Sequence, residues 1–238
     1  MGSNIVALQY DMHAHIRLGD IEDYSSYEKE HVIPVVVHEF VEASTDYPVV
    51  FVKNAQTGQF QPVILTALKP SGNLFVRQGK WPEGYIPRLI RNQPFGFLPN
   101  SHDETQLMMA IDLDRIQGGD SEGERLFDDN GQETDYLKAR KQQLIEHFEQ
   151  NQITEGFVQL ILKMDLLVAR SLTVDIPEDR ITLRGFYFID ENKLNELSDE
   201  VFLDLRKRGF LQVIYAHLIS LHQINRLANL AMARKNMA

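Results

Sequence analysis

The sequence predicts an α+β fold, with an antiparallel β-sheet in the N-terminal half and helices plus a β-hairpin in the C-terminal half. Short apolar segments separated by turn residues fill the region from 31 to 76, a pattern typical of strands joined by tight turns. Beyond residue 133, apolar residues recur at spacings of three and four, which indicates helices. Within that helical region, the β-like segments 172–176 and 181–189 flank Pro177-Glu178-Asp179-Arg180, which predicts a hairpin.

The length of 238 residues fits one domain, and no internal repeat divides the chain. We therefore expect a single domain over residues 1–238. It comprises a β-rich half (1–117), an acidic loop (118–135) and a mainly helical half (136–238) that contains the hairpin at 172–189. The apolar pair Leu126-Phe127 is expected to anchor the acidic loop to the core.

Composition excludes several classes of function. The net charge of −10 argues against a general nucleic-acid binder, although a local basic patch is compatible with it. The chain has no cysteine, which excludes thiol catalysis, Cys-ligated zinc and Fe–S clusters. No apolar run approaches the roughly 20 residues that a membrane span requires. The N-terminus lacks the pattern of a secretory signal, so we expect a cytoplasmic location.

In the N-terminal half, the expected elements are short. Residues 4–8 and 32–36 resemble edge strands, and residues 38–45 a short helix. Residues 49–52 and 60–68 predict two strands paired across a turn, with a third strand at 74–76 completing a meander. A further strand is expected at 107–113.

In the C-terminal half, residues 133–150 predict a polar helix, and Thr154 is expected to cap a second helix. That second helix is expected to bury Phe157, Leu160, Met164 and Leu167 on one face. A later helix is expected to begin at Ser198 and to end at Gly209. The last helix should run from 210 to about 233, with a buried first half and a second half available for a homo-oligomer contact.

The segment from Trp81 to Phe97 is the most unusual part of the sequence. It contains the only tryptophan, three prolines, and two arginines three positions apart. The prolines fix φ and remove backbone donors, so a long helix or a central strand is excluded, while a short helical turn between Pro87 and Asn92 is compatible. Its aromatic side chains should pack against a core as a strap.

The motif Trp-Pro-x-x-Tyr-Ile-Pro followed by Arg-x-x-Pro-Phe resembles the SapC family of bacterial proteins. Other segments agree with that resemblance: His38-Glu39-Phe40, Tyr47-Pro48-Val49-Val50-Phe51, Gly72-Asn73-Leu74-Phe75-Val76, Leu183-Arg184-Gly185-Phe186-Tyr187, Ile189-Asp190-Glu191, Gly209-Phe210-Leu211 and His217-Leu218-Ile219-Ser220-Leu221. The resemblance spans almost the whole chain. It implies association with a bacterial surface layer by name alone, and it carries no reaction and no established catalytic residues. Arg88 departs from the expected pattern and adds a charge.

The strap carries the leading hypothesis for a ligand site. In a helical turn, Arg88 and Arg91 would face one carboxylate, phosphate or sugar acid, while Trp81 and Tyr85 would stack on a sugar ring or an extended peptide. The alternative is purely structural. On that interpretation the aromatic side chains brace the core, and Arg91 pairs with an acid such as Glu39 or Asp112.

Histidines supply the second hypothesis. On a strand, His13 and His15 would share one face and begin a metal site. His217, in the last helix, is expected to be a core histidine bonded to Ser220 or to a backbone carbonyl. The sequence thus favours a SapC-like binding or accessory protein of a surface or nutrient-uptake system. The alternative is an uncharacterised enzyme that depends on a metal held by His13 or His15, and no cofactor or catalytic residue follows from the sequence.

Overall fold

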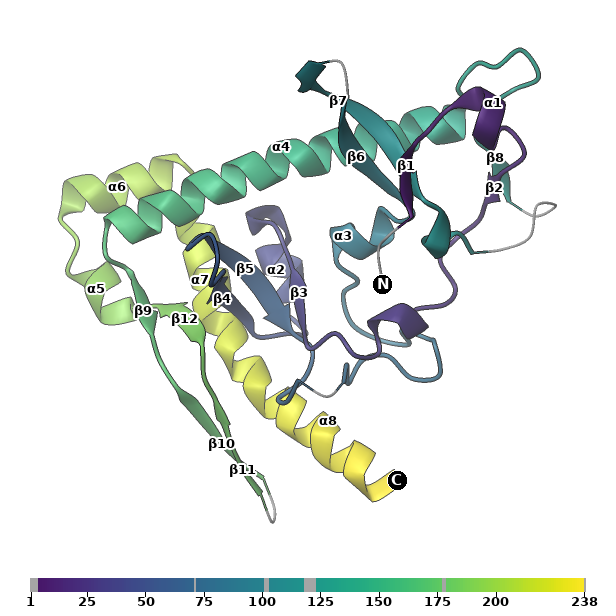
Figure 1. The fold of residues 1–238 in the computed structure, drawn as a ribbon. Helices are drawn as coiled ribbons and strands as arrows, with labels where there is room; N and C mark the ends of the chain where they lie inside the picture. Colours follow the sequence, from purple (N-terminus) through teal and green to yellow (C-terminus); the bar gives the residue numbers. More distant parts are fainter. Residues whose placement is uncertain (1–3, 71, 101–102, 118–122, 177–178, 238) are drawn as a thin grey trace. The chain divides into compact units, whose positions relative to one another are not determined.

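A computed structural model describes residues 4–70, 72–100, 103–117, 123–176 and 179–237 (Figure 1). It contains both helices and antiparallel sheets, which confirms the α+β prediction. The chain divides into two compact units. The first unit comprises Met1–Asp23 and Arg88–Glu149, and the second comprises Tyr24–Pro87 and Gln150–Ala238.

The second unit is built on a five-stranded antiparallel sheet of order β3-β5-β4-β12-β9 (Figure 1). The strands are β3 (Val32–Pro34), β5 (Phe60–Leu65), β4 (Val49–Lys53), β12 (Phe186–Ile189) and β9 (Leu167–Ala169). The predicted β4–β5 hairpin and the edge position of β3 are confirmed. Three of the five strands come from the N-terminal half, and β12 pairs with β4 to join the two halves of the sequence.

The predicted third strand at 74–76 is wrong. Phe75 and Val76 are buried, but they lie in a loop, where the Asn73 side chain accepts a hydrogen bond from the Phe75 N–H and turns the chain. A short apolar run is compatible with either a strand or a buried loop. The free edge of β4 is instead occupied by β12.

Helices cover this sheet and supply much of its core. They are η2 (Val37–Glu39), α2 (Phe40–Ala43), the C-terminal part of α4 (Asp135–Lys163) and α7 (Phe210–Ser220). Phe40 contacts the rings of Phe51 and Phe157, at centroid distances of 6.3 and 6.4 Å, and Phe157 contacts Phe210 at 5.1 Å. These edge-on contacts join the sheet to three helices.

Helix α4 corrects the prediction of two helices, because its 29 residues run without interruption through Thr154. Thr154 is therefore no cap. Its hydroxyl donates to the Gln150 carbonyl within the helix and accepts a hydrogen bond from the Val37 N–H. The predicted buried face is also partly wrong. Leu160 and Met164 are only half-buried and Leu167 lies on β9, whereas Phe157, Val158 and Ile161 are buried.

The hairpin predicted in the helical half is present as β10 (Leu172–Ile176) and β11 (Asp179–Leu183), and Figure 1 shows it extending beyond β9 and β12. The predicted strand 181–189 breaks at Arg184-Gly185 into β11 and β12, which belong to different sheets. Of the predicted turn, Pro177 and Glu178 lie outside the described residues.

The other described elements of the second unit are η1 (Ser25–Tyr27), α5 (Glu191–Asn195), α6 (Asp199–Lys207), η4 (Leu221–Gln223) and α8 (Ile224–Met237). Gly209 ends α6 with a φ of 76°, as predicted, because glycine tolerates this left-handed conformation. The last helix, expected to be continuous from 210, is interrupted by the 3₁₀ turn η4.

The first unit contains a three-stranded sheet of order β1-β7-β6 and a small two-stranded sheet of β2 and β8. The bounds of its elements are β1 (Ile5–Ala7), α1 (Tyr10–His13), β2 (Arg17–Leu18), α3 (Arg88–Arg91), β6 (Phe95–Asn100), β7 (Asp103–Asp112), η3 (Leu113–Arg115) and β8 (Glu124–Arg125). The predicted edge strand at 4–8 and the strand at 107–113 are confirmed as β1 and β7.

The core of the first unit confirms the anchor predicted in the acidic segment. Leu126 and Phe127 are buried in one cluster with Phe95, Ile111 and Leu137. The predicted loop 118–135 is not wholly irregular, because residues 124 and 125 form β8 and α4 begins at Asp135. Residues 118–122 lie outside the described part of the chain.

His217 is a fully buried polar residue in α7, as the sequence predicted. Its Nδ1 donates to the Val49 carbonyl (2.8 Å), and its Nε2 accepts a hydrogen bond from the Ile189 N–H (3.0 Å). These partners select the neutral ring with the proton on Nδ1. Burial lowers the pKa of His217 from 6.5 to about 4, against the opposing effect of the Val49 hydrogen bond.

The burial of the side chains on α4 predicts different losses in the free energy of unfolding for two Ile→Ala substitutions. Ile161 is fully buried, so Ile161→Ala should reduce the free energy of unfolding by about 2–5 kcal/mol. Ile153, on the same helix, is 44% exposed, and Ile153→Ala should cost less than about 1 kcal/mol. Denaturant unfolding of the two variants measures both values. Equal losses would show that the buried face of α4 is assigned incorrectly.

The His217 environment predicts a loss of stability in acid. The unfolded chain takes up a proton on this histidine near pH 6.5, while the folded chain resists protonation down to about pH 4. The stabilising contribution is therefore complete above pH 6.5 and falls by about 3 kcal/mol as the pH drops to about 4. His217→Gln keeps a donor and an acceptor but cannot titrate, so its stability should vary less over this window.

The control is His15→Gln, because His15 is exposed. Urea unfolding at several values of pH compares both variants with the parent. A pH dependence that His217→Gln leaves unchanged would contradict the assignment.

Candidate functional site

The strap motif is divided between the two units. Trp81 and Tyr85 belong to the second unit, whereas Arg88 and Arg91 belong to the first, where they form the ends of α3. The two parts are therefore described separately.

In the second unit, the strap aromatics hydrogen-bond to their surroundings. Trp81 is 8% exposed, its Nε1 donates to the Tyr47 hydroxyl (3.2 Å), and its ring meets the Tyr24 ring edge-on at 5.7 Å. The Tyr85 N–H donates to the Asp46 carboxylate (2.8 Å), and the Tyr85 hydroxyl donates to Glu39 (2.9 Å). Both residues thus have partners typical of a structural role.

Tyr47 links these contacts. Its hydroxyl donates to the Tyr85 carbonyl (2.7 Å) while it accepts the Trp81 hydrogen bond. Burial raises the pKa of Tyr47, which keeps the phenol protonated and able to donate. Arg226 of α8 forms an ion pair with Asp46, and its guanidinium lies 5.5 Å from the centre of the Phe75 ring. We call this group the strap brace: Asp46, Tyr47, Trp81, Tyr85 and Arg226.

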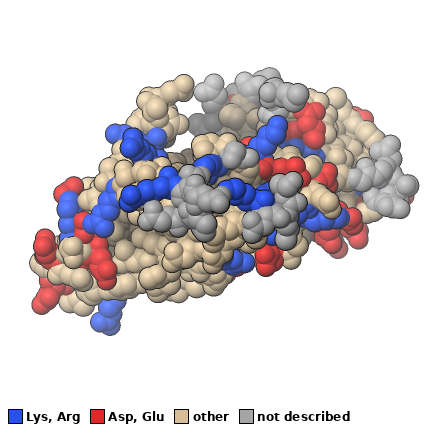
Figure 2. Space-filling view, turned by 90° about the horizontal axis from the view of Figure 1, so that it is seen from below, with Lys and Arg blue, Asp and Glu red and all other residues tan. Residues whose placement is uncertain are grey.

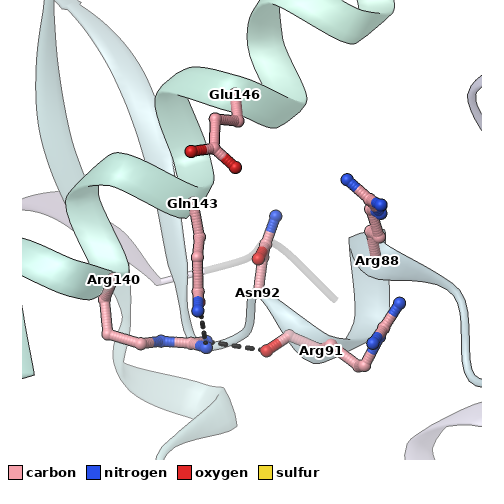
Figure 3. A pocket seen from close by; sticks show the side chains of 6 residues that line it. All are labelled: Arg88, Arg91, Asn92, Arg140, Gln143 and Glu146. Atoms are coloured by element: carbon pink, nitrogen blue, oxygen red, sulfur yellow. Dashed lines mark hydrogen bonds between the residues drawn. The ribbon is translucent and has the colours of Figure 1, made fainter. Parts of the chain in front are cut away.

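The arginines of the strap line a cavity of about 240 Å³ in the first unit. Arg88, Arg91 and Asn92 come from α3 and the residue after it, and Arg140, Gln143 and Glu146 come from α4 (Figure 3). The three α4 residues are spaced by three, which places them on one side of the helix. We call this the arginine cavity.

Arg140 forms one wall of the arginine cavity and is held by several contacts. Its guanidinium donates to the Arg91 carbonyl (2.7 Å), to the Gln93 carbonyl (3.3 Å) and to the Gln143 side chain (2.8 Å), and it lies 5.6 Å from the centre of the Phe95 ring. Burial lowers the pKa of Arg140. Its Nε is buried and has no hydrogen-bond partner among the described residues.

Asn92 is the most buried polar side chain of the arginine cavity, with 8% exposure. Figure 3 shows its carboxamide directed into the space between α3 and α4. Within the described part of the chain, this carboxamide forms no hydrogen bond, although a buried amide usually has a partner. The carboxamide of Asn92 therefore lines the cavity with donors and an acceptor that no described residue uses.

Sequence reasoning identified Arg88 and Arg91 but missed Asn92, Arg140, Gln143 and Glu146. The spacing of the last three on a predicted polar helix was an available signal, since it places them on one face. The sequence does not show that this face of α4 lies beside α3, because that arrangement is set by tertiary packing. For the expected partners of Arg91, the structure shows Asp112 in an ion pair with Arg115 (3.6 Å), and Glu39 accepting hydrogen bonds from Tyr85 and from the Val36 N–H.

The net negative charge does not prevent local positive surface. Figure 2 shows basic as well as acidic side chains gathered on the face that it displays. An anionic ligand is thus compatible with the overall charge of −10.

The histidine hypothesis is corrected in its geometry. The chain enters α1 at Tyr10, so His13 lies on a helical turn and shares no strand face with His15. His13 is buried with its Nδ1 3.0 Å from both the N and the O of Gln9, whereas His15 is exposed. Among the described residues, no group of three or more histidines and acids is placed to hold a metal ion.

The strap brace predicts a strong effect at Gly84, which has a φ of +90°. A Cβ there would lie 2.8 Å from the Tyr47 hydroxyl, so Gly84→Ala should destabilise the protein by more than about 1 kcal/mol. At Gly19, an added Cβ meets no described atom within 4 Å, and Gly19→Ala should change stability by less than that. Thermal unfolding compares the two variants, and equal melting temperatures would contradict the brace.

Over the residues that the structure describes, no helix has both the length and the apolar character needed to cross a membrane. No curated protein and no solved structure matches the chain. A family model described as SapC matches residues 8–227, which covers both units and most of the sequence. The chain therefore belongs to the SapC family.

Proposed function

We propose that this protein is a binding protein that holds a small anionic ligand in the arginine cavity, as an accessory component of a bacterial cell-surface or nutrient-uptake system. The observation that carries the proposal is the carboxamide of Asn92, which lines the cavity beside three guanidinium groups and has no hydrogen-bond partner among the described residues. A ligand acceptor would bond the Asn92 amide together with the guanidinium groups, and each such hydrogen bond contributes about 0.5–1.5 kcal/mol or more.

The chemistry of the lining favours a carboxylate or a phosphate. Guanidinium groups present planar sets of donors that match these anions, and Asn92 adds amide donors. Arg140 is already fixed by backbone carbonyls, so little conformational entropy remains to be lost when a ligand binds.

Glu146 narrows the class of ligand further. Its carboxylate also lines the arginine cavity and accepts a hydrogen bond from Gln142 (3.1 Å). A ligand that places an anionic group near the arginines therefore needs a donor, such as a hydroxyl or an ammonium group, near Glu146. Sugar acids and amino acids satisfy both requirements. In this proposal, Trp81 and Tyr85 support the second unit and do not touch the ligand.

Asn92 and Arg88 provide the test. A thermal-shift screen with sugar acids, amino acids and phosphorylated sugars should find a compound that raises the melting temperature. Asn92→Leu should bind it at least about tenfold more weakly, because the amide donors are lost, and should melt near the parent, because no hydrogen bond to a described residue is removed. Arg88→Ala should weaken binding by about 10- to 100-fold, since a hydrogen bond to a charged group contributes about 1.5–3 kcal/mol.

Arg206→Ala on α6 is the matched control, because it removes an exposed arginine and the same charge. Binding by this variant should equal that of the parent. If no compound in the screen binds, or if Asn92→Leu binds as well as Arg206→Ala, the proposal is refuted.

A further inference from the structure

The second unit contains another cleft, also of about 240 Å³, with a different chemistry. Its walls come from the end of β3, from the β4–β5 hairpin between Asn54 and Pro62, and from α4 between Asn151 and Gln159. All of these segments belong to the second unit. We call it the amide cleft.

Carboxamides dominate the polar lining of the amide cleft: Asn54, Gln59, Gln61, Asn151 and Gln159. The side chains of Gln59, Gln61 and Gln159 form no hydrogen bond with another described residue. Asn54 uses its Oδ1 to accept from the N–H groups of Gln56 and Thr57, which leaves its NH₂ group available. The cleft therefore offers unused donors and acceptors from both the hairpin and the helix.

Charge in the amide cleft is sparse. Glu155 is the one ionisable residue among the described residues that line it. Lys53, on the adjoining strand, has its ammonium 5.3 Å from the centre of the Phe60 ring and lines a neighbouring cavity. An anion would meet no cationic partner in this cleft, so the lining suits an uncharged ligand.

The rest of the wall is apolar and held in place. Val35 and Val158 are buried side chains, and Phe60 is half-buried with its ring against Tyr187 at 4.7 Å. Thr154, in the floor, accepts a hydrogen bond from the Val37 N–H and so connects α4 to the segment after β3. This apolar part of the wall therefore loses little entropy when a ligand binds.

From this combination we propose that the amide cleft binds a neutral saccharide. Each sugar hydroxyl is both a donor and an acceptor, as each carboxamide is, and the C–H faces of a sugar ring suit an apolar wall. An extended peptide fits less well. It would pair with a strand edge, and Pro34 on the edge strand β3 has no N–H to donate.

The test is an NMR titration that follows the side-chain NH₂ resonances of Gln59, Gln61 and Gln159. The probes are glucose, galactose, mannose, N-acetylglucosamine and disaccharides of them, with an end-blocked Gly-Ser-Gly peptide for comparison. At least one saccharide should shift these resonances in a saturable manner. Gln61→Ala and Gln159→Ala should each weaken its binding by about tenfold, because each removes hydrogen bonds to the ligand.

Gln56→Ala is the matched control, since Gln56 lies on the same hairpin but lines the neighbouring cavity instead. It should bind the saccharide as the parent does. The proposal is overturned if no saccharide shifts the resonances, if the peptide shifts them in place of the saccharides, or if Gln56→Ala weakens binding as much as Gln61→Ala. None of these outcomes involves the arginine cavity, which is lined by other residues in the other unit.

Discussion

Two hydrogen bonds of the His217 ring connect β4, from the N-terminal half of the sequence, with β12, from the C-terminal half. One ring nitrogen bonds the carbonyl of Val49 at the start of β4, and the other bonds the N–H of Ile189 at the end of β12. Ser220, one turn further along α7, accepts from the Val49 N–H (2.9 Å) and donates to the His217 carbonyl (2.6 Å). Without these side chains, backbone groups of both strands would be buried without partners, so the sheet of the second unit depends on α7.

The proposed binding site uses only the second part of the strap, whereas the first part braces the second unit. That first part, with Trp81 and Tyr85, has its polar groups bonded to Tyr47, Asp46 and Glu39. The second part begins at α3 and includes Asn92, whose amide has no partner among the described residues. Bracing and binding thus place opposite demands on adjacent residues. A brace requires every polar group to be satisfied from within, whereas a binding site leaves some for the ligand.

The fold was predictable wherever local pattern decides structure. The β4–β5 and β10–β11 hairpins follow from apolar segments on either side of turn residues, and the buried, bonded state of His217 follows from its apolar helix. The pairing of β12 with β4 was not predictable, because strands distant in sequence meet through tertiary packing. The prediction of a helix cap at Thr154 was wrong for a similar reason. Threonine is a residue type typical of a cap, but the Thr154 hydroxyl donates to the Gln150 carbonyl inside the continuous helix α4 and accepts from the N–H of Val37 in η2.

The candidate sites were less predictable than the fold, and the reason is physical. A ligand site is formed by side chains whose hydrogen-bonding capacity the fold leaves unused, and a sequence does not show which groups those are. Arg88 and Arg91 are conspicuous in the sequence because of their charge, whereas Asn92, between α3 and β6, is identified only by the fold, which places its amide in the cavity without a partner among the described residues. The carboxamides of the amide cleft are individually ordinary surface residues. They form a candidate site only because β5 and α4 place Gln61 and Gln159 in the lining of the same cavity.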